Sequence, residues 1–127
     1  MRVFLVRHAE AAPGEPDELR RLTPAGRDAA RALGERLAAE HPTAVVTSPL
    51  LRARETADLI ARACKLEATA DDNLAPGATA AALRAAAADK GSTVVAVGHQ
   101  PDCSEIVLEL TGRDVSFPPA GVAELDL

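Results

Sequence analysis

The chain alternates between short apolar runs and longer stretches in which apolar residues recur with helical spacing. Short runs bounded by loop residues are typical of buried strands, and the longer spacing is typical of helices packed on one side. The predicted strands are Val3–Val6, Ala44–Thr47, a weak Leu66–Ala70, Thr93–Val97, Val115–Phe117 and Val122–Leu127. The predicted helices run from Pro24 to about Ala39, from Pro49 to about Cys64, over residues 79–88, and from Pro101 to about Leu110.

Proline and hydroxyl residues mark where two of these helices begin. Thr23-Pro24 and Ser48-Pro49 each place an N-cap residue directly before a proline suited to the first helical turn. In the helix after Thr23, the spacing of Ala29, Leu33 and Leu37 predicts an apolar stripe that faces the sheet.

The alternation of strands and helices predicts an α/β fold of three layers. We expect a mostly parallel central sheet, covered by helices on both faces. The last two predicted strands are close together in the sequence, so an antiparallel edge strand or strands should complete the sheet. Residues 9–21 and 71–78 are rich in proline, glycine and charge and are predicted loops. A chain of 127 residues is expected to form a single domain, 1–127.

Composition and charge narrow the range of partners. The chain carries 14 Lys and Arg against 19 Asp and Glu, for a net charge of −5, and only 2% of its residues are aromatic. Without a basic surface or stacking aromatics, we expect no nucleic-acid partner and no membrane partner. No apolar run is long enough to span a membrane, and no signal peptide is recognisable. The two cysteines, Cys64 and Cys103, are then expected as reduced thiols in a cytoplasmic protein.

Three polar clusters each follow a predicted strand directly. They are Arg7-His8, Thr47-Ser48-Pro49 with Arg52, and Gly98-His99-Gln100-Pro101. Ligands of open parallel sheets bind outside the carboxyl ends of the strands, so the three clusters should meet there. Two arginines and two histidines in one place suit an anion with tetrahedral oxygens, since arginine offers paired donors to phosphate. A bound anion would also offset the unfavourable position of Arg52 at a helix N-terminus.

The sequence lacks the motifs of nucleotide-binding phosphate loops and the spacings of metal ligands. We therefore expect no metal and no cofactor. A metal-free phosphate site with paired arginine and histidine favours histidine as the nucleophile toward phosphorus. Neutral imidazole is a competent nucleophile, and its ordinary pKa of about 6.5 leaves it mostly neutral at pH 7.

Four segments, in order along the chain, resemble motifs of the histidine phosphatase superfamily, whose fold is phosphoglycerate-mutase-like. Residues 6–10, Val-Arg-His-Ala-Glu, are similar to its Arg-His-Gly signature, with Ala9 in place of the glycine. Residues 20–26 resemble its Leu-Thr-x-x-Gly segment, and residues 47–57 resemble its Ser-x-x-x-Arg-Ala-x-x-Thr-Ala segment. Residues 97–101 resemble its second-histidine motif.

The resemblance implies a role for each matching residue. His8 would be the nucleophile that accepts the phosphoryl group. Arg7, Arg52 and His99 would neutralise the transferring phosphoryl oxygens, and Arg20 matches an arginine that lies near the phosphate in close relatives. Such stabilisation of equatorial oxygens is what phosphoryl transfer mainly requires of a protein.

The chain departs from the mutase-like members in one respect. These carry a proton-donating glutamate after the third strand, where this chain has Pro76. Asp71, Asp72 or Glu10 could substitute, or no acid need be present.

The short chain and the Leu-x-Pro stretch resemble the small bacterial phosphohistidine phosphatases. The resemblance implies a phosphorylated protein, with its phosphate on a phosphorelay histidine, as partner and substrate. The alternatives are a phosphatase of small phosphorylated metabolites and a phosphoprotein-binding module without turnover.

Overall fold

A computed structural model describes all residues, 1–127, and contains one five-stranded sheet of order β3-β2-β4-β1-β5. The strands are β1 (Arg2–Arg7), β2 (Ala44–Thr47), β3 (Ala68–Ala70), β4 (Thr93–Gly98) and β5 (Val122–Asp126). Strands β1 to β4 pair in parallel, whereas β5 pairs antiparallel with β1. The predicted parallel sheet with an antiparallel edge strand is confirmed.

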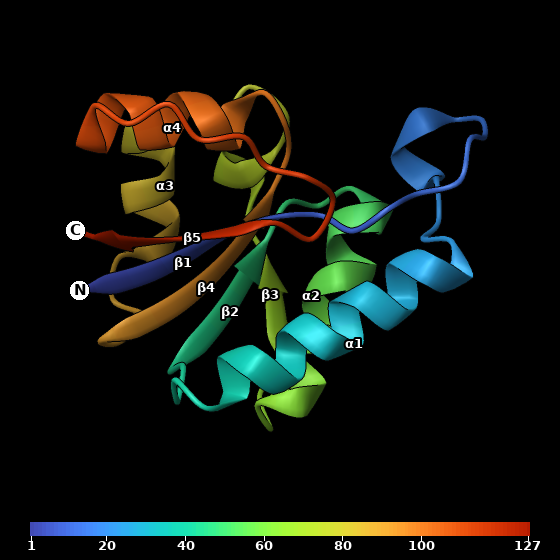
Figure 1. The fold of residues 1–127 in the computed structure, drawn as a ribbon, viewed down its shortest axis with the longest axis horizontal. Helices are drawn as coiled ribbons and strands as arrows, with labels where there is room; N and C mark the ends of the chain where they lie inside the picture. The colour runs from blue at the N-terminus through green and yellow to red at the C-terminus, as the bar shows by residue number, and fades with distance from the viewer.

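Helices cover both faces of the sheet (Figure 1). Helices α1 (Pro24–Ala38) and α2 (Leu51–Ala63) lie on one face, and α3 (Ala80–Ala87) and α4 (Asp102–Thr111) lie on the other. Two short 3₁₀ turns, η1 (Asp17–Leu19) and η2 (Asp72–Leu74), fall inside the predicted loops. The three-layer α/β architecture agrees with the prediction. None of the four α-helices has the length and apolar character that a membrane span requires.

Successive side chains along the strands point to opposite faces of the sheet and so divide the hydrophobic core into two clusters. On β1, Val3 and Leu5 pack toward α3 and α4, while Phe4 and Val6 pack toward α1 and α2. Every residue of β4 is buried, because this strand has neighbours at both edges and helices on both faces. The rigid centre of the molecule is therefore the β1–β4 pair, whose carboxyl ends carry the two predicted site histidines.

The start of α1 agrees with its sequence signal, whereas the predicted Ser48 cap with a helix beginning at Pro49 is wrong for α2. The hydroxyl of Thr23 accepts a hydrogen bond from the Gly26 amide at 3.0 Å, and Pro24 occupies the first turn of α1. Helix α2 begins at Leu51, two residues after Pro49, and lacks a side-chain cap at its N-terminus. The Ser48 hydroxyl accepts instead from the Leu50 amide at 3.2 Å, which keeps Ser48 at the strand end.

Two further predictions about local structure were wrong. Residues Val115–Phe117 form no strand, and side chains satisfy two of their carbonyls, because the Ser104 hydroxyl donates to Val115 O and Arg7 donates to Phe117 O. In α1 the buried alanine is Ala30 rather than Ala29, which is exposed. Both neighbours are alanines, so composition could not tell which of them turns inward.

Candidate active site

The ends of β1 and β4 bring the two histidines together. Arg7 and Gly98 are register partners in the parallel β1–β4 pair, so His8 and His99 leave the sheet side by side. The His8 amide donates to Gly98 O at 3.0 Å, which ties the two strand ends. The ring centroids lie 5.2 Å apart with the rings tilted by 60°. The predicted convergence of these two clusters is present in the fold.

His8 is held in one tautomer by its own backbone. Its Nδ1 lies 2.8 Å from the Ala9 carbonyl oxygen, which can only accept, so Nδ1 carries the proton and Nε2 carries the lone pair. Burial lowers the pKa of His8 from its ordinary 6.5; the Ala9 hydrogen bond opposes this shift, and the charges of Arg52, Arg7 and Arg20 add to it. At pH 7 the ring is neutral, with Nε2 available as a nucleophile.

His99 is buried, with 4% of its surface exposed. Its Nε2 lies 2.7 Å from the Ser48 hydroxyl, which fixes the ring. Burial, and then the nearby His8 and Arg52, lower the pKa of His99 to about 4. In the free protein at pH 7 this ring is neutral, so it offers a hydrogen bond rather than a charge. A dianion bound beside it would raise that pKa and favour the imidazolium.

Arg52 and Arg20 converge on one carboxylate. Arg52, 7% exposed in the first turn of α2, donates from Nη1 to Asp17 O at 3.0 Å and from Nη2 to Asp17 Oδ2 at 3.3 Å. Arg20 donates from Nη1 to Asp17 Oδ1 at 3.1 Å and from Nε to Ala12 O at 2.9 Å. The anion expected beside Arg52 is thus supplied, in the free protein, by Asp17.

Arg7 is fixed by the turn that precedes β5. Its Nη1 donates to Phe117 O at 2.9 Å, and the Ala120 amide donates to the Arg7 and His8 carbonyls at 3.1 and 3.2 Å. The Nε of Arg7 is buried and has no hydrogen-bond partner within the protein. An unpartnered buried donor costs free energy, so Arg7 retains donor capacity that a ligand oxygen could use.

Two further positions of the predicted motifs, Thr56 and Gly26, contact the segment that follows β1. The Thr56 hydroxyl accepts from the Ala9 amide at 3.0 Å and donates to Arg52 O at 2.8 Å, so it joins the His8 segment to α2. A Cβ at Gly26 would overlap the Glu10 carbonyl oxygen, so α1 needs glycine there to approach the same segment. These contacts explain why a threonine and a glycine stand at these places.

A match to a known protein family covers several residues of the candidate active site. The profile of the histidine phosphatase superfamily (branch 1) matches residues 3–76, which include His8, Arg20 and Arg52. The chain belongs to the histidine phosphatase superfamily. An uncharacterised protein of Picosynechococcus sp. (strain PCC 7002) is 34% identical, over 98% of this chain and 84% of that protein.

Solved structures of histidine phosphatases superpose closely on this chain. The protein histidine phosphatase SixA, in complex with tungstate, has a TM-score of 0.88 at 28% identity, covering 100% of this chain and 88% of SixA. SixA from Agrobacterium tumefaciens has a TM-score of 0.83 at 31% identity, covering 98% and 90%. A mycobacterial glucosyl-3-phosphoglycerate phosphatase, with a TM-score of 0.75 at 19% identity, covering 97% and 88%, shows the fold alone. The enzymatic interpretation is confirmed, and the protein is a phosphatase.

None of the three carboxylates that could substitute for the missing glutamate pairs with a side chain of the candidate site. The Glu10 carboxylate accepts a hydrogen bond from the Thr23 hydroxyl at 2.7 Å, and the Asp71 carboxylate accepts one from the backbone N–H of Asn73 at 2.8 Å. Asp72 is exposed and makes no side-chain hydrogen bond, and none of the three pairs with the site arginines or histidines. The site carboxylate is Asp17, which sequence reasoning missed; its position three residues before Arg20 was the available signal.

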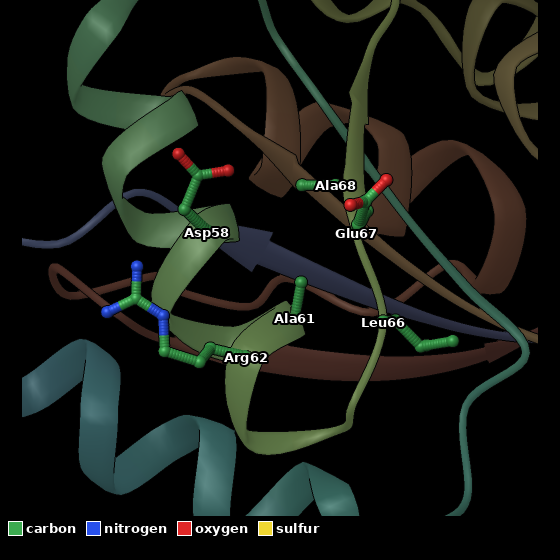
Figure 2. Close-up of a pocket in the computed structure, with 6 residues that line it drawn as sticks. All are labelled: Asp58, Ala61, Arg62, Leu66, Glu67 and Ala68. Atoms are coloured by element: carbon green, nitrogen blue, oxygen red, sulfur yellow. The ribbon is translucent and has the colours of Figure 1, made fainter.

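The largest cavity of the histidine phosphatase lies away from the histidines. It measures about 440 Å³ and opens between α2 and the segment that enters β3 (Figure 2). Its lining residues are Asp58, Ala61, Arg62, Leu66, Glu67 and Ala68. No cavity is lined by Arg7, His8, Arg20, Arg52 or His99. Convergent nucleophile and cations, rather than volume, identify the candidate active site.

Proposed function

We propose that this phosphatase transfers a phosphoryl group from phosphohistidine on a protein to His8, and then to water, without a metal. The observation that carries the proposal is the hydrogen bond from His8 Nδ1 to Ala9 O at 2.8 Å. It leaves the Nε2 lone pair beside His99, Arg7 and Arg52, the side chains suited to bind phosphoryl oxygens. Residues 1–127 would act as one domain.

The first step forms a covalent intermediate. The Nε2 lone pair of His8 bonds to phosphorus while the bond from phosphorus to the substrate nitrogen breaks, and its electron pair returns to the substrate ring. The equatorial oxygens would receive hydrogen bonds from Arg7, Arg52 and His99, with Arg20 farther out. In-line displacement needs this charge stabilisation more than any covalent help.

The second step regenerates the enzyme. A water molecule attacks phosphorus from the side that the leaving group vacated, and the bond from phosphorus to His8 Nε2 breaks. The electron pair returns to Nε2, and the water proton leaves with inorganic phosphate or solvent. The proton on Nδ1 stays in place throughout, so His8 leaves as a neutral imidazole, which makes it a good leaving group.

The loop at Pro76 supports phosphohistidine over a metabolite ester. Pro76, at the position where mutase-like members carry the acid, is exposed, and the amides of Gly77 and Ala78 donate to the buried Asp102 carboxylate at 2.8 and 3.1 Å, which fixes this loop. An alkoxide leaving group needs a proton from such an acid, whereas a protonated phosphohistidine ring does not. The similarity to the protein histidine phosphatase SixA supports the same substrate class.

The test is to trap the intermediate. Brief reaction with a ³²P-labelled phosphohistidine protein, followed by denaturation in base, should leave label on the enzyme that acid releases. The label should be absent from His8→Ala and present in His41→Asn, which alters an exposed histidine outside the site. Label retained by His8→Ala would refute His8 as the nucleophile.

A further inference from the structure

Asp17 is the only carboxylate that pairs with an arginine of the candidate site. Its two oxygens take separate partners, Arg20 at 3.1 Å and Arg52 at 3.3 Å. The Asp17 side chain is 60% exposed while that of Arg52 is 9% exposed, so the carboxylate covers Arg52 on its solvent side. The hydrogen bond from Arg20 lowers the pKa of Asp17, followed by the charge of Arg52, so it is ionised at neutral pH.

Asp17 is the exposed anion at the edge of the candidate site. His8 directly follows β1 and is half-buried, and its Nδ1 faces the Ala9 carbonyl, so Nε2 is the nitrogen left to approach phosphorus. In-line displacement puts the leaving group on the side of phosphorus away from His8. The exposed η1 turn packs against α2, and its Asp17 lies close enough for its charge to act on His99. An exposed anion beside the site is available to a leaving group that departs toward solvent, whereas Arg52 is buried behind it.

A phosphohistidine ring leaves well only when its second nitrogen carries a proton. The ring is then a cation with an N–H donor, and breaking the bond to phosphorus yields neutral imidazole. A carboxylate that accepts from this N–H favours the protonated ring, because an opposite charge stabilises the charged form. An ester of an alcohol offers no such donor.

We propose, building on the proposed function, that Asp17 determines substrate specificity by accepting a hydrogen bond from the protonated ring N–H of phosphohistidine and by repelling bare phosphate. In the transfer step the His8 Nε2 lone pair forms the new bond to phosphorus, and the electron pair of the broken bond neutralises the ring. The ring keeps its N–H, so Asp17 gains no proton and remains an anion for the next turnover.

The experiment compares Asp17→Asn with Glu18→Gln. Glu18 lies in the same turn, is exposed and makes no side-chain hydrogen bond or ion pair. Glu18→Gln therefore removes one negative charge from this turn, as Asp17→Asn does, without removing a contact to an arginine. Inorganic phosphate is tested as an inhibitor of aryl phosphate turnover, and kcat/KM is measured for a phosphohistidine peptide and for the aryl phosphate. Circular dichroism confirms that each variant is folded.

In Asp17→Asn, phosphate should inhibit about five- to tenfold more tightly, as expected when one unit charge near a dianion is removed. The kcat/KM for phosphohistidine should fall about ten- to a hundredfold, the range for a hydrogen bond to a charged group, while that for aryl phosphate is kept or rises. The alkaline limb of kcat with phosphohistidine should also move to lower pH, because the bound ring loses its proton more easily. Glu18→Gln should match the wild type within about twofold, as surface substitutions usually do.

Several results would overturn the inference. Weaker or unchanged phosphate inhibition in Asp17→Asn would mean that Asp17 only holds the arginines in place. Equal losses on both substrates, or the same effects in Glu18→Gln, would also refute a specific role. If the wild type turned over aryl phosphate but not phosphohistidine, the proposed substrate would fall, together with the N–H contact. The phosphate comparison would still measure the repulsion by Asp17 independently.

Discussion

At the scale of single residues, the proton on His8 Nδ1 decides which nitrogen can react. The Ala9 carbonyl accepts a hydrogen bond from that N–H, and burial, together with the charges of the neighbouring arginines, lowers the pKa of the ring and disfavours a second proton. We expect His8→Ala to lose turnover by several orders of magnitude, as enzymes do when a covalent nucleophile is removed. Steady-state kinetics with an aryl phosphate will measure the loss, with His41→Asn as control. Near-wild-type turnover in His8→Ala would place the nucleophile elsewhere.

His99 should make stability depend on pH in a predictable direction. Its pKa is about 4 in the folded protein and 6.5 in the unfolded chain, so between these values only the unfolded chain takes up the proton. The free energy of unfolding therefore falls as pH drops from 6.5 to 4, by on the order of 3 kcal/mol from this group. Urea unfolding at pH 7, 5.5 and 4.5 should give a smaller drop for His99→Gln than for the wild type. An equal drop in both would contradict the assignment.

At the scale of elements, the approach of α1 to the end of β1 depends on one glycine. Glycine within a helix normally costs stability, so Gly26→Ala would ordinarily stabilise α1. Here the added Cβ would overlap the Glu10 carbonyl oxygen, and the chain segment would have to move. We expect Gly26→Ala to lose about 1–3 kcal/mol, the usual cost of overpacking.

The control for this substitution is Gly14→Ala. A Cβ at Gly14 would meet only the Arg20 Cγ at 3.9 Å, an ordinary contact. Thermal unfolding of the wild type and both variants measures the two changes in stability, and only Gly26→Ala should lower it. A Gly26→Ala protein as stable as the wild type would mean that α1 can shift without cost.

Elements with strong local signals could be predicted from the sequence, and those without could not. The apolar run of β4 and the Thr23-Pro24 start of α1 are such signals, and both are confirmed. The predicted strand at Val115–Phe117 was wrong, because a short apolar run does not show that side chains from elsewhere in the chain will donate hydrogen bonds to its carbonyls. Asp17 was missed because its position depends on a loop that folds back onto α2, and no periodicity in the sequence encodes such contacts.

At the scale of the whole molecule, the proposed mechanism without a general acid should set the order of substrate preference. We expect kcat/KM at pH 7 to be highest for phosphohistidine, lower for an aryl phosphate and lowest for sugar or glycerate phosphates. An acid is worth roughly 10²–10⁴-fold for a poor leaving group, so the last class should suffer by that order. One substrate of each kind, assayed in excess EDTA, gives the comparison. A metabolite ester faster than phosphohistidine by tenfold, or strong loss in EDTA, would contradict the mechanism.

The burial of β4 has a consequence for how the protein opens. Its backbone amides are paired within a sheet that is covered on both faces, so they should exchange with deuterium only when the whole molecule unfolds. The amides of η1 lie in an exposed turn and should exchange far sooner, through local opening. His99 directly follows β4, so it should keep its place until the whole molecule unfolds. Asp17 belongs to η1, which should open locally. Deuterium uptake could therefore follow the carboxylate releasing Arg52 while the histidine pair stays intact.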